Sequence, residues 1–475
     1  MTSLQMVAKN YTIQTIGKML TVLVGIFAVA IIARSLGKEG IGAYTTAMTY
    51  LTIFGTIVEF GMTLTLIQMI SIRDQTKEAR VINSLLGLRV VSGLLFYSLA
   101  PILVQIFPYS PATKLAVVVG TLGYFFMTST GLLIGFFQKH LIIWRFALSE
   151  LLNRGFFLLL VIFFTWLGFK TVGMVAAFAI ANILWFIAVF FLIRPYIKIR
   201  PSFDKDLWKE AFHRSWPIGL STICNLVYLK GDIMFLAAFR SEAVVGIYGI
   251  AYKIIDVVTM IPVMLMGLLL PSLTLLWKEQ NKADFARFLQ KAFDFFMILA
   301  IPIVFGAQAV ATPLSVLIGG DEFVDSGPIL RILIIATLGL FISSLYGHTV
   351  VAIEKQKSMA PGYALTAFLT IIGYLIFIPR FGVWGAAGMT LFSEFLIGVL
   401  TFIMVVRTTH IYPNLLVLFK VLLASIIMYV FLMFLPAWPV LLQITLGTLF
   451  YILILLSIGG VKFITIKSLF YKQTG

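Results

Sequence analysis

Long apolar stretches separated by short polar ones run through the whole chain. Each stretch has about 20 or more residues with few charges, which is the length of a helix that crosses the hydrocarbon core of a bilayer. Clusters of charged residues, Gly and Pro separate them and mark helix ends. The pattern therefore predicts about fourteen membrane spans. They lie near residues 11–33, 41–68, 82–107, 113–137, 143–166, 171–193, 215–238, 245–275, 288–310, 328–352, 360–379, 382–406, 413–435 and 438–461.

Composition supports an all-α, polytopic membrane protein. Of 475 residues, 61% are hydrophobic and 11% are charged, and the mean hydropathy is +1.05. A soluble protein of this length could not cover such a composition with polar surface. The first residues lead directly into a long span, so we expect no cleavable signal peptide. One cysteine and four scattered histidines show no ligand spacing, so we expect no metal site.

Lysine and arginine alternate between the loops. They are frequent after even-numbered spans, as at Arg73, Lys77 and Arg80, whereas the stretch "GGDEFVDSG" after span 9 carries only acids. By the positive-inside rule, both termini and the even-numbered loops are expected in the cytoplasm of a cell-membrane protein. The net charge of +16 follows from this topology, so we do not expect nucleic acid as a partner.

An internal repeat organises the chain. The stretch "ARSLGKEGIGAY" at residues 33–44 is similar to "AFRSEAVVGIYGIAY" at residues 238–252, and "GFKTVGMVAA" before span 6 is similar to "RFGVWGAAGM" before span 12. The offsets, about 205 and about 212 residues, indicate a duplicated six-helix unit. The prediction is two pseudo-symmetric six-helix lobes, 1–200 and 201–410, related by an axis along the membrane normal, followed by two extra helices in 411–475.

These motifs, together with "EFGM" at the end of span 2 and "IPIVFG" in span 9, resemble the polysaccharide transporters, or O-antigen flippases. That family belongs to the multidrug/oligosaccharidyl-lipid/polysaccharide exporter (MOP) superfamily. The resemblance implies two lobes around a cavity that opens alternately to each side of the membrane, often with two extra C-terminal helices. It also implies flipping of undecaprenyl-pyrophosphate-linked oligosaccharides. The family usually has "DFG" where this chain has Glu59-Phe60-Gly61, which keeps the charge.

Several ionisable residues lie inside the expected spans. Each costs about 2.5–3.5 kcal/mol if it faces lipid near mid-membrane, so we expect them to face water or one another. Five cations are candidates for a path that guides an anionic pyrophosphate headgroup: Lys18, Arg89, Arg154, Lys230 and Lys253. Asn10 and Gln14 extend a polar stripe from Lys18 at four-residue spacing and are expected to support it.

Some of these residues have a simpler interpretation. Lys253 and Asp256 share a helix face at i, i+3, so they could be a self-neutralising pair, or Asp256 could orient Lys253 as a headgroup ligand. Lys253 is expected roughly 10 Å below the outer surface, too deep for easy snorkelling. Arg89 and Arg154 could instead snorkel to the cytoplasmic headgroups.

Two acids are candidates for ion coupling. Asp232 and Glu394 could bind sodium or a proton in the return step, and Thr390 could add a sodium ligand. Alternatively, Lys230 simply neutralises Asp232. No other cofactor is expected.

Several functions compete with flipping of lipid-linked oligosaccharides. A lipid II flippase shares the fold and the charge logic, whereas a multidrug exporter would favour acids and aromatics in its cavity. A membrane polymerase or ligase, the enzyme alternative, would need a larger outer loop. Polymerase machinery and membrane lipids are candidate partners. The hairpin glycines could act as hinges or simply form tight turns: Gly37, Gly40, Gly42, Gly382 and Gly385.

Overall fold

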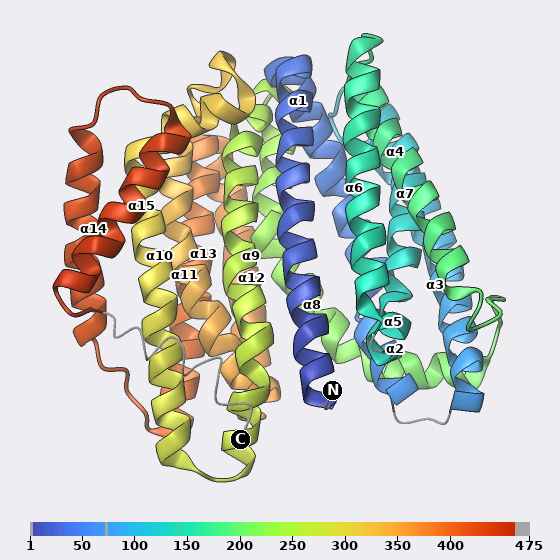
Figure 1. Cartoon of the computed structure of the whole chain (residues 1–475). Coiled ribbons are helices and arrows are strands. Elements are labelled where there is room, and N and C mark those ends of the chain that lie inside the picture. Colours follow the sequence, from blue (N-terminus) through green and yellow to red (C-terminus); the bar gives the residue numbers. More distant parts are fainter. Residues whose placement is uncertain (1–2, 72–74, 141, 461–475) are drawn as a thin grey trace. The chain divides into compact units, whose positions relative to one another are not determined.

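A computed structural model describes residues 3–71, 75–140 and 142–460, and these residues are almost entirely helical (Figure 1). Side chains at 3–16, 75, 76, 221 and 228 are outside the description. The helices are α1 (Ser3–Glu59), α2 (Met62–Ser71), α3 (Gln75–Leu103), α4 (Pro111–Leu132), α5 (Ile134–Lys139), α6 (Ile143–Trp166), α7 (Thr171–Ile193), α8 (Lys205–Phe239), α9 (Glu242–Lys278), α10 (Lys282–Gly319), α11 (Ser326–Ala352), α12 (Gln356–Phe381), α13 (Val383–Thr409), α14 (Leu416–Met433) and α15 (Val440–Ser457). Two 3₁₀ turns are η1 (Val104–Ile106) and η2 (Asp321–Phe323).

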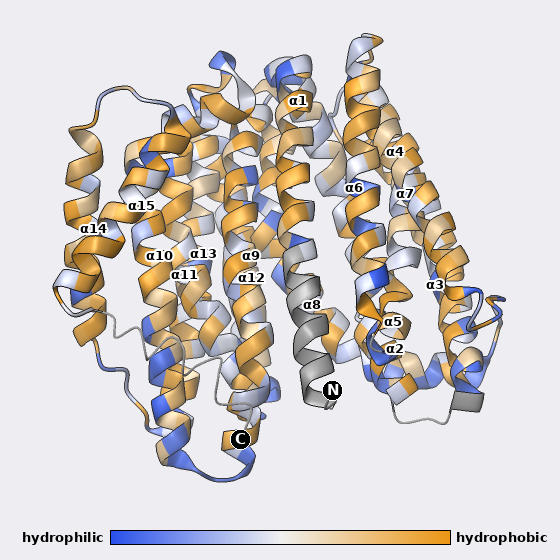
Figure 2. Cartoon of the chain, viewed as in Figure 1, coloured by the Kyte–Doolittle hydropathy of each residue, from blue (hydrophilic) through white to orange (hydrophobic). Residues whose placement is uncertain are grey.

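The helix lengths confirm a polytopic membrane protein. Among the described residues, 12 helices are long and apolar enough to cross a membrane, and the bent helix α8 raises the number to 13. One of the 12, Gly17–Ser71, has 55 residues, about twice what one crossing needs. It breaks at Gly37, where φ is 65°. The segments before and after Gly37 are each long enough for one crossing. When they are counted as two spans, the total agrees with the about fourteen spans expected from the sequence. Figure 2 shows hydrophobic residues along most helices and hydrophilic ones gathered near helix ends.

The chain divides into two compact units, Met1–Gly249 and Ile250–Gly475. Helices α1 to α8 pack together in the first unit, and α8 contacts α1, α2 and α3. In the second unit α11 packs on α10 and α13, α12 packs on α13, and α14 and α15 pack on α10. The expected lobe limits near residues 200 and 410 stay a prediction.

The segment between α7 and α8 is fixed to α3 inside the first unit. Asn83 donates a hydrogen bond to the Lys198 carbonyl at 3.0 Å and accepts one from the Arg200 backbone amide at 2.9 Å. Arg80 binds Asp204 at 2.7 Å, and Asp204 also caps the start of α8. The Arg80 guanidinium holds the pKa of the Asp204 carboxyl below its ordinary value. This connection sets where α8 begins.

Two connectors, residues 201–217 and 278–293, have amphipathic sequences that predict either short helices along the membrane interface or plain connectors between bundles. In the structure both are largely helical: the first opens α8 from Lys205, and the second, after a turn at 279–281, becomes the start of α10 at Lys282. Their position along the interface stays a prediction. The helices are therefore longer than the apolar runs, because polar residues such as Lys, Glu and Arg are good helix formers and extend them beyond the bilayer core.

A reciprocal glycine contact joins the second arm of α1 to the start of α9 within the first unit. A Cβ on Gly42 would overlap the backbone oxygen of Glu242, and a Cβ on Gly246 would overlap the backbone oxygen of Lys38. Lys38 and Glu242 each stand four residues before the glycine of their own segment. These segments are the two copies of the sequence repeat, so the contact is what a local two-fold relation between the copies would produce. Only glycine permits so close an approach.

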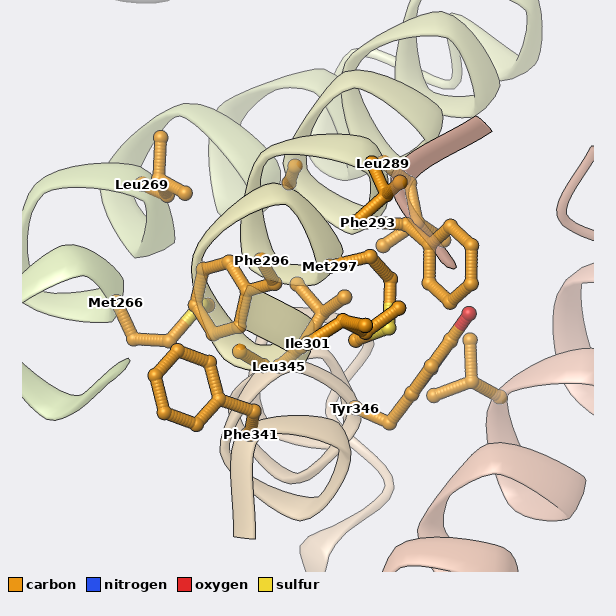
Figure 3. Close-up of a cluster of buried hydrophobic side chains, with 14 of the residues drawn as sticks. Met266, Leu269, Leu289, Phe293, Phe296, Met297, Ile301, Phe341, Leu345 and Tyr346 are labelled. Atoms are coloured by element: carbon orange, nitrogen blue, oxygen red, sulfur yellow. The ribbon is translucent and has the colours of Figure 1, made fainter. Parts of the chain in front are cut away.

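The core of the second unit is an aromatic and aliphatic cluster to which all helices from α9 to α15 contribute, and Figure 3 shows a part of it with side chains of α9, α10 and α11. Phe296 and Phe341 are fully buried and meet edge to face, with ring centroids 5.9 Å apart. Tyr451 of α15 donates a hydrogen bond to the Ile298 carbonyl of α10 at 2.9 Å. Helix α15 therefore contacts α10 through this hydrogen bond as well as through apolar packing.

Candidate functional site

Arg89 of α3 forms a buried ion pair that the sequence did not reveal. Its side chain is 0% exposed, and its Nη2 lies 2.5 Å from Oε2 of Glu59, whose side chain is 33% exposed. The Nε and Nη1 groups of Arg89 have no hydrogen-bond partner among the described residues. Snorkelling to the headgroups is therefore wrong for Arg89 in this structure. A guanidinium buried so deeply depends on the one carboxylate beside it.

Glu59 stands at a joint between helices. The backbone after it leaves the helical region, with φ of 39° at Phe60 and 73° at Gly61, and α2 then begins at Met62. The second oxygen of Glu59 accepts a hydrogen bond from the Thr63 amide at 3.1 Å, which caps α2. The Phe60 ring stacks on Phe212 of α8. One of the motifs behind the family resemblance, "EFGM", thus makes a joint between α1 and α2 and also pairs with Arg89.

Lys18 of α1 is paired with Glu150 of α6. Its Nζ lies 2.8 Å from Oε1 of Glu150, and the two side chains are 44% and 19% exposed. The side chains of Asn10 and Gln14 lie outside the described residues, so the polar stripe that they were expected to form with Lys18 stays a prediction.

Arg154 is one helical turn after Glu150 on α6 and is half-buried. Within the described part of the chain it makes no hydrogen bond or ion pair. Lys18, Arg89 and Arg154 are the three candidate cations of the first six spans, and among the described residues Arg154 is the one of them that pairs with no carboxylate.

Asp232 of α8 is fully buried in the first unit. Tyr248, itself 0% exposed, donates a hydrogen bond of 2.6 Å to Oδ2, and the Ile233 amide donates one of 2.7 Å to Oδ1. Lys230 lies on the same helix and is half-buried. Tyr248 is a hydrogen-bond partner of this candidate acid that the sequence did not reveal, and it links Asp232 to the start of α9.

Lys253 and Asp256 lie on α9 in the second unit. Their side chains are 37% and 30% exposed, and Nζ is 3.6 Å from Oδ2. The expected i, i+3 pair is therefore formed. Its length and exposure are compatible with both interpretations, because a partly exposed ammonium remains accessible to an anion while Asp256 orients it.

Glu394 and Thr390 lie on α13 in the second unit and are 3% exposed each. The Thr390 hydroxyl donates to the Ala386 carbonyl at 3.1 Å. A Cβ on Gly339 of α11 would overlap the backbone of Glu394, so α11 and α13 cross very closely at the acid. Glu394 is thus buried at a helix crossing, as an intramembrane acid was expected to be.

Comparison with known proteins now gives the family. A model of the polysaccharide biosynthesis protein family matches residues 7–277, more than half of the chain. The chain belongs to the polysaccharide biosynthesis protein family. A curated relative, the probable flippase AglR of Haloferax volcanii, is 28% identical over 189 residues, which are 37% of this chain and 37% of AglR. The chain thus matches little more than a third of the length of that relative.

Solved structures show the fold of this family member. The lipid II flippase MurJ, in an inward closed conformation, matches with a TM-score of 0.77 and 16% identity over 93% of this chain and 97% of MurJ. An inward-facing multidrug resistance MATE transporter of the MOP superfamily matches with a TM-score of 0.68 and 13% identity over 84% of this chain and 98% of the transporter. The resemblance seen in the sequence is confirmed. The chain is a multi-pass membrane protein of the polysaccharide biosynthesis protein family, and its fold is the one seen in MurJ and in the MATE transporter.

Proposed function

We propose that the protein flips a polyprenyl-diphosphate-linked oligosaccharide from the cytoplasmic to the outer leaflet by alternating access. The match to the polysaccharide biosynthesis family over residues 7–277 carries this proposal. Such a substrate is a large anionic amphiphile, and a protein that passes its headgroup through the membrane needs cations away from lipid. Arg154 and Lys253, half-buried cations on α6 and α9, have the right chemistry for the diphosphate.

Lys18 and Arg89 are each paired with a carboxylate on another helix, whereas the partner of Lys253, Asp256, lies one turn away on the same helix. Lys18 is paired with Glu150 and Arg89 with Glu59, so a diphosphate would have to compete with a carboxylate for either of them. Lys18 is the more accessible of the two at 44% exposure. We therefore place Lys18 with Arg154, Lys230 and Lys253 on the headgroup path and give Arg89 mainly a role in holding the joint at Glu59.

Export assays can separate the two interpretations of Lys253 and Asp256. If Lys253 binds the headgroup, Lys253→Gln should abolish export, whereas Asp256→Asn should only reduce it. If the two residues are a structural pair, both variants should be impaired to the same degree. Expression and membrane insertion of each variant, measured in the same cells, provide the control.

We propose that ion binding at Asp232 and at Glu394, with Thr390 as an additional oxygen ligand, drives the return step. Burial supports this role, because a carboxylate shielded from water changes charge readily when a cation or proton arrives. In proteoliposomes, Asp232→Asn with Glu394→Gln should remove the response of transport to an imposed sodium or proton gradient. A full gradient response in the double variant would reject the coupling sites.

We also propose that the protein lies in the cell membrane with both termini in the cytoplasm. Its proposed partner is the polymerase machinery that would receive the exported unit. Reporter fusions after Arg214 and after Gly320 should report opposite sides of the membrane, and equal signals would reject the topology.

The lipid II flippase remains the second candidate, supported by the fold that the chain shares with MurJ. Supplying purified lipid II and a polyprenyl-diphosphate oligosaccharide to the same vesicles decides between them.

A further inference from the structure

The α12–α13 hairpin carries an apolar groove with a cavity of about 550 Å³. Its lining consists of Leu, Ile, Met, Phe and Trp side chains together with glycines, and no charged residue takes part. About half of the surface is exposed at each of Ile376, Phe377, Phe381, Trp384 and Phe392. The groove belongs to the second unit alone and shares no residue with the candidate cation path or with the coupling acids.

Glycines shape this groove. A Cβ on Gly385 would overlap the backbone of Phe377, so the two helices come together near the hairpin turn at Gly382. Gly388, one turn further along α13, has nothing within 4 Å of the position where its Cβ would stand. The absence of a side chain at Gly388 therefore leaves space that a hydrocarbon chain can fill.

One cation stands at the hairpin end of the groove. Arg380 is in the last turn of α12 and exposed. It follows Ile376 and Phe377 at four and three residues, so it lies on the helix face that lines the groove. Within the ranges that the structure describes, Arg380 has no hydrogen bond or ion pair. An apolar groove that ends in a free arginine beside Trp384 and Phe381 is complementary to an amphiphile with an anionic head and a hydrocarbon tail.

We propose that this groove is a binding site for an anionic phospholipid, with one acyl chain along Gly388 and the phosphate at Arg380. The bilayer favours this occupant by mass action, because phospholipid surrounds every span at high concentration whereas carrier lipids are scarce. Zwitterionic phospholipids enter the same groove less tightly, since their headgroup has no net charge for Arg380 to attract. The proposal is independent of which glycan the protein carries.

The test uses the full-length protein in detergent, titrated with phosphatidylglycerol or phosphatidylethanolamine and observed by native mass spectrometry. One interfacial arginine near an anionic headgroup should give phosphatidylglycerol an advantage of about fivefold in affinity. Arg380→Gln should abolish this advantage. Gly388→Leu should weaken binding of both lipids, because Gly388 lines the groove and the new side chain would occupy space there.

Gly155→Leu on α6 is the matched control. Gly155 also has nothing within 4 Å of its Cβ position, but it is remote in sequence from the hairpin. This variant should bind both lipids like the wild type. Unchanged binding in Gly388→Leu, or an undiminished preference in Arg380→Gln, would overturn the proposal. Displacement of phosphatidylglycerol by equimolar polyprenyl phosphate would also overturn it and would give the groove to the carrier lipid.

A wild-type experiment covers the case in which a variant does not fold. Phosphatidylglycerol with a photoreactive acyl chain should label peptides from residues 369–392 after illumination in proteoliposomes. Label spread evenly over the other spans, with no enrichment in this hairpin, would contradict a specific site.

Discussion

Neutralising Glu59 should destabilise the first unit far more than neutralising an exposed ion-pair partner. Glu59→Gln keeps the size of the side chain and an oxygen that can accept from the Thr63 amide, but it removes the charge that pairs with Arg89 among the described residues. Breaking a buried pair by removing one partner costs about 3–5 kcal/mol, because the other charge stays buried. Glu59 is 33% exposed, so water screens the pair and we expect a loss near the lower end, about 3 kcal/mol.

The control pair is Lys18 and Glu150. Lys18 is 44% exposed, so Lys18→Gln should cost at most about 1 kcal/mol. The free energy of unfolding is measured for purified protein in mild detergent by titration with a denaturing detergent. The double variant Glu59→Gln with Arg89→Met removes the buried charge together with its partner and should be more stable than Glu59→Gln alone. Equal losses for Glu59→Gln and Lys18→Gln, or no recovery in the double variant, would refute the reasoning.

Two further predictions concern packing and pH. Gly42→Ala should destabilise the protein, because the new Cβ would overlap the Glu242 carbonyl. Gly25→Ala should be neutral or slightly stabilising, since nothing lies within 4 Å of its Cβ position. Thermal unfolding of both variants checks this, and equal unfolding midpoints would contradict it. Because Arg80 lowers the pKa of Asp204, the contribution of this pair to stability is present above the ordinary carboxyl pKa and is lost as the pH falls through the lowered value. Proteolytic cleavage within residues 194–204 should therefore become faster below about pH 3.8. The Asp204→Asn variant should show this faster cleavage already at pH 7. A cleavage rate that is independent of pH in the wild type would contradict a stabilising pair of Arg80 and Asp204.

The number and order of the spans could be predicted because hydrophobic runs are local in sequence and their length is set by the bilayer. The repeat could be recognised because each copy is a short, contiguous stretch of sequence. The reciprocal contact of Gly42 and Gly246 is its counterpart in the structure. Helix ends were less predictable. Lys205 and Lys282 begin helices well before the apolar runs, because polar residues extend a helix into water at no cost.

Charge pairing was the part that the sequence concealed. Composition identified Lys18 and Arg89 as costly cations, but their partners are 132 and 30 residues away. Glu150 and Glu59 lie on other helices, and only packing of α1 against α6 and α3 brings them within reach. The i, i+3 pair of Lys253 and Asp256 was predictable because both residues share one helix. Tyr248 was missed because a tyrosine in an apolar span gives no signal until its hydroxyl is seen to reach Asp232.

The central claim is that the protein flips lipid-linked oligosaccharide, and a quenching assay in proteoliposomes tests it most directly. Vesicles carry a fluorescent polyprenyl-diphosphate oligosaccharide on both leaflets, and a membrane-impermeant reductant bleaches only the outer one. With the protein present, we expect nearly all of the fluorescence to be lost, whereas a fluorescent phosphatidylcholine in matched vesicles should lose only its outer-leaflet share. Retention of the inner-leaflet oligosaccharide signal, or equal loss of both lipids, would contradict the account.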